Sequence, residues 1–204
     1  MLVALMPLQG QIAIGKWRDH LSFTSVNHVE PASDRIYAAG TMGMFYYDTE
    51  EMTLNLMTKT SGLSDIGIAT FAYDAASHYL VIAYSNSNVD LVKDDKVYNI
   101  SDIKRGSIDG SKTISHIRFY NRRAYLACDF GIVVINLARH EIENTYHLGK
   151  QGNHYAVRDI AFHKGNIVAA TEIGLASAPQ DDPYLNIETH WNWDSGSILA
   201  GRPI

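Results

Sequence analysis

The sequence predicts an all-β fold, a β-propeller of about four four-stranded blades of roughly 44 residues each, in an incomplete ring. The main observation is a repeat of four similar segments. Each is centred on an alanine (Ala39, Ala83, Ala127 or Ala170), and the alanines are spaced by 44, 44 and 43 residues. The second observation is composition, because 12 Tyr and 15 Gly against 5 Pro favour strands and tight turns over helices. We assign residues 12–204 to the propeller.

The first strand of each repeat is predicted from residues at two fixed positions, thirteen and ten residues before the alanine. These residues are Val26, Thr70, Ile114 and Val157 at the earlier position, and Val29, Tyr73, Ile117 and Ile160 at the later one. Turn residues then lead into the second strand, which carries the alanine. A small side chain at this position lets neighbouring sheets pack closely.

A glycine or serine four residues after each alanine predicts a tight turn into the third strand, at Gly43, Ser87, Gly131 and Gly174. Glycine readily adopts the positive φ that such hairpins require, and Asn88 beside Ser87 tolerates the same backbone region. Third strands follow at once, as in 132–135, and fourth strands are amphipathic, as in 142–146.

Two other repeat architectures were weighed against the propeller. The coils of a β-solenoid are usually shorter, at about 20–30 residues, and a chain of β-sandwiches would not repeat four times at constant spacing. After the fourth unit, residues 195–204 resemble the start of a fifth. Closed propellers commonly have about six to eight blades, which predicts that this chain is part of a longer ring. A compact four-bladed ring is the alternative.

The N-terminal residues Met1–Leu8 form an apolar run, and we interpret residues 1–11 as the remnant of a signal peptide. The alternative is an N-terminal strand or tail. The run is shorter than the roughly 20 residues that a membrane helix needs, and no later apolar stretch reaches that length. These features predict an exported protein without a transmembrane segment.

Charge and cysteine content exclude two classes of function. The net charge is −5 and the isoelectric point about 5.9, whereas nucleic-acid-binding domains usually carry a basic excess. A single cysteine, Cys128, excludes an intrachain disulfide and a cysteine-ligated zinc site. We expect Cys128 to be a buried structural thiol, because no neighbouring feature lowers its pKa.

No catalytic motif is present: the sequence contains no glycine-rich phosphate loop, no HExxH and no GxSxG. His28, His116 and Asp159 each precede an alanine of the repeat by eleven residues, and Ala72 takes that position in the second repeat. Equivalent positions lie at one radius in a propeller, so these three side chains could approach a shared channel. The favoured interpretation is that they are ordinary repeat positions. We therefore predict no enzyme activity, no cofactor and no metal site.

Several segments resemble a known family. Ser61-Gly62-Leu63-Ser64-Asp65, together with the glycine turns, resembles the two-component regulator propeller repeat. The wider arrangement is more similar to the N-terminal propeller of the PorZ family of the type IX secretion system. The similar segments are Trp17-x-x-His20, Ala83-Tyr84, Asn88-Val89-Asp90-Leu91, Ala-Cys-Asp-Phe-Gly-Ile-Val-Val at 127–134, Glu141 and Thr145-Tyr146. The stretch at 127–134 is the most specific.

The resemblance implies a non-enzymatic surface component at the periplasm or outer-membrane cell surface. It would work beside a sortase-like protease, with anionic lipopolysaccharide as a ligand. No binding residue is implied, but five basic loop residues could form one positive face: Lys104, Arg105, Arg122, Arg123 and Lys150. The alternatives are an oligosaccharide-sensing propeller of a hybrid two-component regulator, and a propeller enzyme, for which no set of catalytic residues can be assembled.

Overall fold

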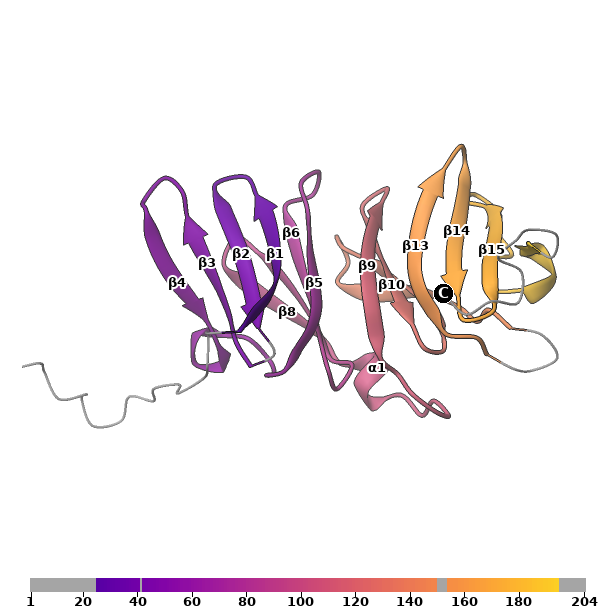
Figure 1. The fold of residues 1–204 in the computed structure, drawn as a ribbon, viewed down its shortest axis with the longest axis horizontal. Helices are drawn as coiled ribbons and strands as arrows, with labels where there is room; N and C mark the ends of the chain where they lie inside the picture. Colours follow the sequence, from indigo (N-terminus) through magenta and orange to yellow (C-terminus); the bar gives the residue numbers. More distant parts are fainter. Residues whose placement is uncertain (1–24, 41, 150–153, 195–204) are drawn as a thin grey trace, which may run out of the picture.

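The computed structural model describes residues 25–40, 42–149 and 154–194, which form four four-stranded antiparallel sheets (Figure 1). The first sheet contains β1 (Val26–Ala32), β2 (Arg35–Gly40), β3 (Met44–Asp48) and β4 (Thr53–Met57). The second contains β5 (Ile68–Asp74), β6 (Tyr79–Tyr84), β7 (Val89–Lys93) and β8 (Lys96–Ile100). The third contains β9 (Ile114–Tyr120), β10 (Arg123–Cys128), β11 (Gly131–Asn136) and β12 (Glu141–Tyr146). The fourth contains β13 (Val157–His163), β14 (Asn166–Thr171), β15 (Gly174–Pro179) and β16 (Asn192–Trp193).

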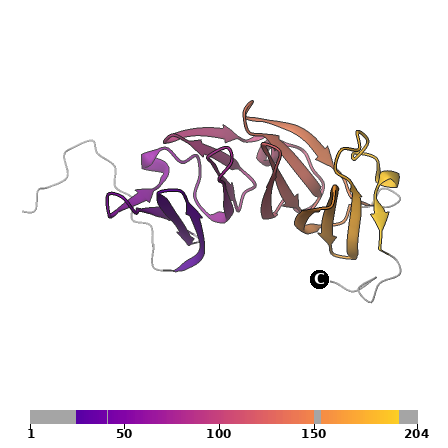
Figure 2. The same ribbon diagram turned by 90° about the horizontal axis from the view of Figure 1, so that it is seen from above.

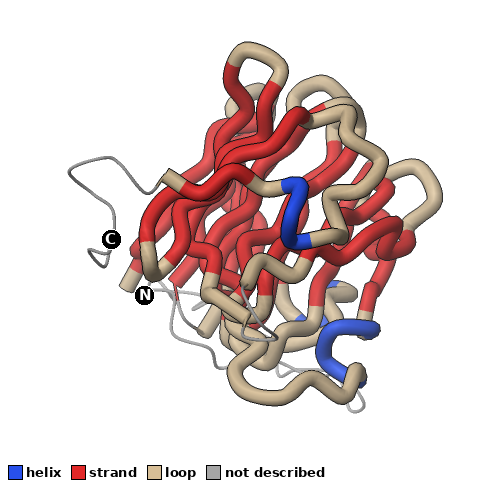
Figure 3. The backbone as a smooth tube through the Cα atoms, turned by 90° about the vertical axis from the view of Figure 1, so that its right-hand side faces the viewer, coloured by secondary structure: helices blue, strands red, loops and turns tan. Residues whose placement is uncertain are grey.

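In every sheet the strands pair in chain order, which is the topology of a propeller blade. The sheets follow one another along an open arc rather than a closed ring (Figure 2). Strands dominate the backbone trace, and within the described residues helix is confined to single turns at η1 (Lys59–Ser61), α1 (Asp102–Arg105) and η2 (Glu188–His190) (Figure 3). The prediction of an incomplete propeller is confirmed.

All four repeat alanines lie in second strands, as predicted, and three of them pack between sheets. Ala39, Ala83 and Ala127 each belong to the hydrophobic core that joins their own sheet to the next one. Ala170 has the same position in the fourth sheet and is only half-buried, because no described sheet follows it. The cores therefore run between successive sheets, and each alanine allows the close approach of the next blade.

The first sheet exposes the face that the later sheets bury. Ile36 is 39% exposed, whereas the equivalent residues of the next three sheets, Leu80, Ala124 and Ile167, are at most 1% exposed. Three further apolar residues lie on the same exposed face: Val29, Leu54 and Leu56. They pair across strands with Ala38, Tyr47 and Phe45, respectively. In the later sheets, the preceding blade covers this face.

The second sheet departs from the predicted register in two places. Its first turn, between Asp74 and Tyr79, is longer, so Phe71 rather than Tyr73 occupies the position of Val29. For the same reason Ile68, not Thr70, corresponds to Val26. Constant sequence spacing concealed this shift, because additional residues in one turn are compensated elsewhere in the repeat.

The turns from second to third strand are confirmed for three sheets. Gly131 and Gly174 have φ values of 134° and 132°, and Ser87 has a φ of 63°. Ala83 pairs with Val89, one residue further along than the pairing of Ala127 with Ile132, so the second sheet has a longer hairpin. The left-handed residue of that hairpin is Ser87, and Asn88 is not needed for this role.

The predicted signal-peptide remnant (1–11), the segment from Trp17 to His20 and the predicted start of a fifth blade (195–204) lie outside the described residues. Among the helices that the structure does describe, none has the length and apolar character required to cross a membrane.

Candidate binding site

The arc has two edges, and each strand runs from one to the other. We call the edge that carries the turns from first to second strand the hairpin edge; it includes residues 33–34, 75–78, 121–122 and 164–165. The opposite edge, which we call the linker edge, carries the connections between sheets and includes α1 (Figure 1). Across β9, a strand of 7 residues, the two edges are roughly 23 Å apart.

The basic loop residues do not form one positive face, so that expectation was wrong. Lys104 and Arg105 lie in α1 at the linker edge, whereas Arg122 and Arg123 lie at the hairpin edge. The two basic pairs are close in sequence, but β9 lies between them and carries the chain from one edge of the sheet to the other. Lys150 lies outside the described residues.

Two of these basic side chains are neutralised by carboxylates. The Nζ of Lys104 is 2.7 Å from Oδ2 of Asp65. The guanidinium of Arg123 donates two hydrogen bonds to Glu143, of 2.9 and 2.8 Å, and this pairing lowers the pKa of Glu143 against the effect of its burial.

Arg122 and Lys164 are exposed cations in the first turns of the third and fourth sheets, at the hairpin edge. They occupy corresponding turns and both have positive φ, at 58° and 47°. Among the described residues, neither side chain has an ion-pair partner, so their charges are available to a ligand.

The first strands of the four sheets bring together the predicted histidine and aspartate positions. His28, His116 and Asp159 pair with Ala39, Ala127 and Ala170, and Thr70 pairs with Ala83. Thr70, not Ala72, therefore takes the fourth position, because of the longer first turn of the second sheet. The innermost strands β5, β9 and β13 lie side by side, which places His116 next to Asp159.

The side chains at these equivalent first-strand positions make structural contacts in which charges are paired. Burial acts to raise the pKa of Asp159, but hydrogen bonds of 3.1 and 2.9 Å from Arg118, a hydrogen bond from the Ile160 N–H and the nearby charges together lower it. His116 Nε2 is 3.8 Å from Asp159, but burial lowers the pKa of His116. His28 packs on Phe71 with ring centroids 4.2 Å apart. Within the described part of the chain, no three His, Cys, Asp or Glu residues are arranged to hold a metal ion.

Cys128 is fully buried, as predicted, in the core between the second and third sheets. Burial raises the pKa of its thiol, so the reactive thiolate is disfavoured.

Asp90 lies in the segment Asn88-Val89-Asp90-Leu91, and the sequence pattern predicted no separate role for it. Its carboxylate is 0% exposed and accepts hydrogen bonds from Tyr84 Oη (2.7 Å), the Ser64 N–H (2.8 Å) and Asn99 Nδ2 (2.8 Å). A charged residue within the apolar run 89–92 was the available signal. The network ties the loop at 61–65 to β7.

Asp65 in that loop provides a pH-dependent link between two connections. One joins the first sheet to the second, and the other, which contains Lys104, joins the second sheet to the third. Burial acts to raise the pKa of Asp65, but hydrogen bonds from Lys104, Asn86 and the Ile66 N–H outweigh it and lower the pKa from 3.8 to about 2. A depressed carboxyl pKa contributes stability above the unfolded-state value, and that contribution is lost as pH falls through the folded-state value.

We expect Lys104→Met to lower the melting temperature at pH 7, with the difference from the parent shrinking as pH falls from 3.8 towards about 2. Arg105→Met, which removes the same charge from the neighbouring residue, is the control and is expected to change the melting temperature little at either pH. Thermal unfolding followed by circular dichroism measures both. A difference that persists undiminished at the lowest pH would contradict the ion-pair account.

A family model described as "TSS9, PorZ, N-terminal beta-propeller domain" matches residues 36–194, most of the chain. The chain belongs to this family. The matched region runs from β2 of the first sheet to the end of the fourth, and it contains the segments on which the resemblance to PorZ was based except Trp17-x-x-His20, which precedes it.

Solved structures agree with this assignment. The surface component PorZ of the type IX secretion system of Porphyromonas gingivalis superposes with a TM-score of 0.71 at 25% identity, covering 81% of this chain and 22% of that one. The extracellular domain of the putative hybrid two-component system BT4673 of B. thetaiotaomicron gives 0.64 at 13% identity, covering 86% and 23%. Citrobacter koseri AztD gives 0.55 at 12% identity, covering 77% and 44%. The last two likenesses show the fold alone.

No curated protein matches the sequence. The chain spans about a fifth of the PorZ chain that it resembles. It is thus similar to one part of a bacterial surface protein.

Proposed function

We propose that this chain is a binding and scaffolding module of an exported surface component of the type IX secretion system, and that it works without catalysis. Its partners would be proteins of the attachment complex, including a sortase-like protease, at the periplasmic or outer face of the outer membrane. The observation that carries this proposal is the match to the PorZ propeller family over residues 36–194. The PorZ structure of P. gingivalis, itself described as a surface component of that system, supports it.

The fold suits such a role because its cores lie between sheets, away from the turns. Residues at the hairpin edge can therefore change without disturbing the packing, and binding through such loops requires no rearrangement of the blades. We assign the contact with anionic lipopolysaccharide to the hairpin edge of the third and fourth sheets. There Arg122 and Lys164 provide exposed, unpaired positive charge on a chain of net charge −5.

The test uses the complete protein that contains this chain, in pull-downs from outer-membrane extracts and in a binding assay with anionic lipopolysaccharide. The double variant Arg122→Ala/Lys164→Ala is expected to bind the lipopolysaccharide about fivefold more weakly, since each exposed ion pair contributes up to about 1 kcal/mol. The effect should diminish at high salt.

The matched control is Lys59→Ala/Arg105→Ala, which removes two exposed cations from the linker edge. It is expected to bind as the parent does. Equal losses of lipopolysaccharide affinity in both variants would indicate general charge attraction instead of a specific contact at the hairpin edge. Recovery of neither secretion-complex proteins nor lipopolysaccharide would defeat the proposal. A kinase domain downstream in the same gene would favour the sensor alternative.

A further inference from the structure

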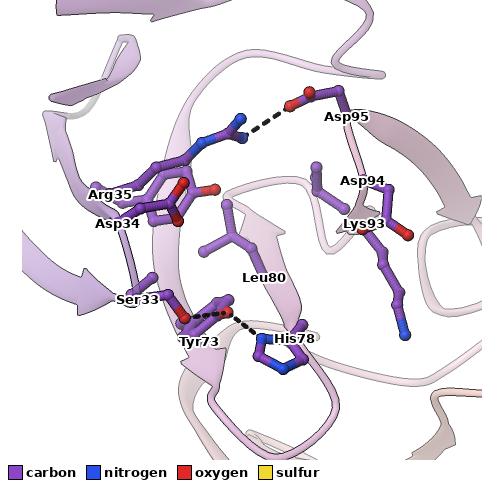
Figure 4. A pocket seen from close by; sticks show the side chains of 12 residues that line it. Ser33, Asp34, Arg35, Tyr73, His78, Leu80, Lys93, Asp94 and Asp95 are labelled. Carbon is purple, nitrogen blue, oxygen red and sulfur yellow. Dashed lines mark hydrogen bonds and ion pairs between the residues drawn. The ribbon is translucent and has the colours of Figure 1, made fainter. Parts of the chain in front are cut away.

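A cavity of about 360 Å³ opens at the hairpin edge between the first and second sheets (Figure 4). Its floor is apolar and buried, formed by Tyr37, Leu80 and Val92. Its rim comes from three turns, those at 33–34, 75–78 and 94–95. The volume lies at the lower end of the range of small-molecule sites, about 300–1,000 Å³.

Polar groups face one another across this cavity. On one side Arg35 Nη1 donates a hydrogen bond of 2.8 Å to Asp95 Oδ1. On the other, Tyr73 Oη lies 2.9 Å from His78 Nδ1 and 3.3 Å from Ser33 Oγ (Figure 4). Both sides therefore offer hydrogen-bond donors and acceptors, with Leu80 between them.

The corresponding space between the second and third sheets is filled by a ring from the chain itself. His140, in the turn that corresponds to Asp94-Asp95, stacks on Tyr98 with centroids 3.8 Å apart. Its Nε2 is 2.8 Å from Tyr79 Oη, and Tyr79 occupies the position of Arg35 at the start of the second strand. The ring of His140 thus packs beside Tyr79, at the position where Asp95 pairs with Arg35 between the first two sheets.

A ring also closes the space between the third and fourth sheets. Tyr120 stacks on Phe162 with centroids 4.6 Å apart, and its hydroxyl accepts a hydrogen bond of 2.6 Å from Gln180 Nε2. Gln180 belongs to the connection that follows the third strand, as do His140 and Asp95. Between the first and second sheets this connection is only Asp94-Asp95, because Lys93 pairs with Lys96, so the connection supplies no ring. The rings that line the cavity are those of Tyr37, Tyr73 and His78.

We propose that this cavity binds a single neutral pyranose ring at the end of a glycan. The cavity, at about 360 Å³, is large enough for one such ring. An apolar floor suits the C–H face of a sugar, and the opposed polar groups suit its hydroxyls. An anionic ligand is disfavoured, because the lining contains Asp34, Asp94 and Asp95 against Arg35 and Lys93.

This site is independent of the proposed lipopolysaccharide contact, which lies on other blades. Its test uses the 204-residue chain with three neutral probes, methyl glucoside, methyl mannoside and N-acetylglucosamine, and one anionic probe, glucuronate. Saturation-transfer NMR and titration calorimetry measure binding. We expect at least one neutral probe to bind with a Kd of about 1 mM, a value consistent with the size of a monosaccharide.

Two rim variants locate the binding. His78→Ala and Asp95→Asn are each expected to weaken it about fivefold, the effect of losing one hydrogen bond. His163→Ala, at the exposed last residue of β13 in the fourth sheet, is the control and should bind as the parent does. Melting curves verify that each variant is folded.

Three results would overturn the proposal. They are the absence of signal from all three neutral probes, tighter binding of glucuronate than of any neutral probe, and binding that neither rim variant weakens. Because the Arg122→Ala/Lys164→Ala variant leaves this cavity intact, failure here is distinguishable from failure of the lipopolysaccharide contact.

Discussion

Replacing Asp90 by alanine is expected to lower the free energy of unfolding by about 3–5 kcal/mol, the cost of breaking a buried charged network. The carboxylate is fully buried in β7, and its removal takes the acceptor from the hydroxyl of Tyr84 and the N–H of Ser64 and one of three acceptors from the amide of Asn99. The first loop between sheets would lose its attachment to the second sheet. Urea denaturation followed by tryptophan fluorescence measures the change.

Asp94→Ala is the matched control, because Asp94 directly follows β7 and is exposed. It is expected to change the free energy of unfolding by no more than about 0.5 kcal/mol. Asp90→Asn keeps one acceptor oxygen and should fall between the two. Equal effects at Asp90 and Asp94 would show that the buried network contributes nothing to stability.

Gly131→Ala is expected to lower the free energy of unfolding by about 3 kcal/mol or more. Gly131 has a φ of 134°, a conformation that L-residues with a side chain rarely adopt, and an added Cβ would overlap the carbonyl oxygen of Tyr146 on the adjacent strand. That oxygen is backbone in a paired strand, so it cannot move without breaking the ladder between β11 and β12.

Gly165→Ala separates the two causes. Gly165 also has a positive φ, at 77°, but an added Cβ there would meet no atom within 4 Å. Only the backbone strain of about 1–2 kcal/mol is therefore expected. Chemical denaturation of both variants gives the comparison, and a Gly131→Ala variant no less stable than Gly165→Ala would contradict the overlap.

The repeat could be predicted from the sequence because each blade packs against its neighbours in the same way. A small residue in the second strand and a left-handed turn after it are local requirements, so Ala39, Ala83 and Ala127 could be aligned by spacing alone. The register of β5 could not be predicted in this way, because the repeat length stays constant although the turn that follows β5 has extra residues. For that reason Phe71 and Thr70, rather than Tyr73 and Ala72, take the equivalent positions.

The candidate sites were less predictable, because they combine residues from different blades and different turns. The grouping of Lys104 with Arg122 failed because a strand separates the two edges of the sheet. The cavity beside Arg35 and Tyr73 has no sequence signature, since its lining combines the turns at 33–34, 75–78 and 94–95, which belong to two different sheets.

The sequence by itself therefore determined the class of fold, the number of described blades, the second strands and the family, because these depend on local periodicity and turn chemistry. Only the tertiary structure decided which charges are paired, which turns share an edge and which inter-blade space stays open. These properties depend on distances between segments about 40 or more residues apart, such as Arg35 and Asp95, and no local pattern records such distances.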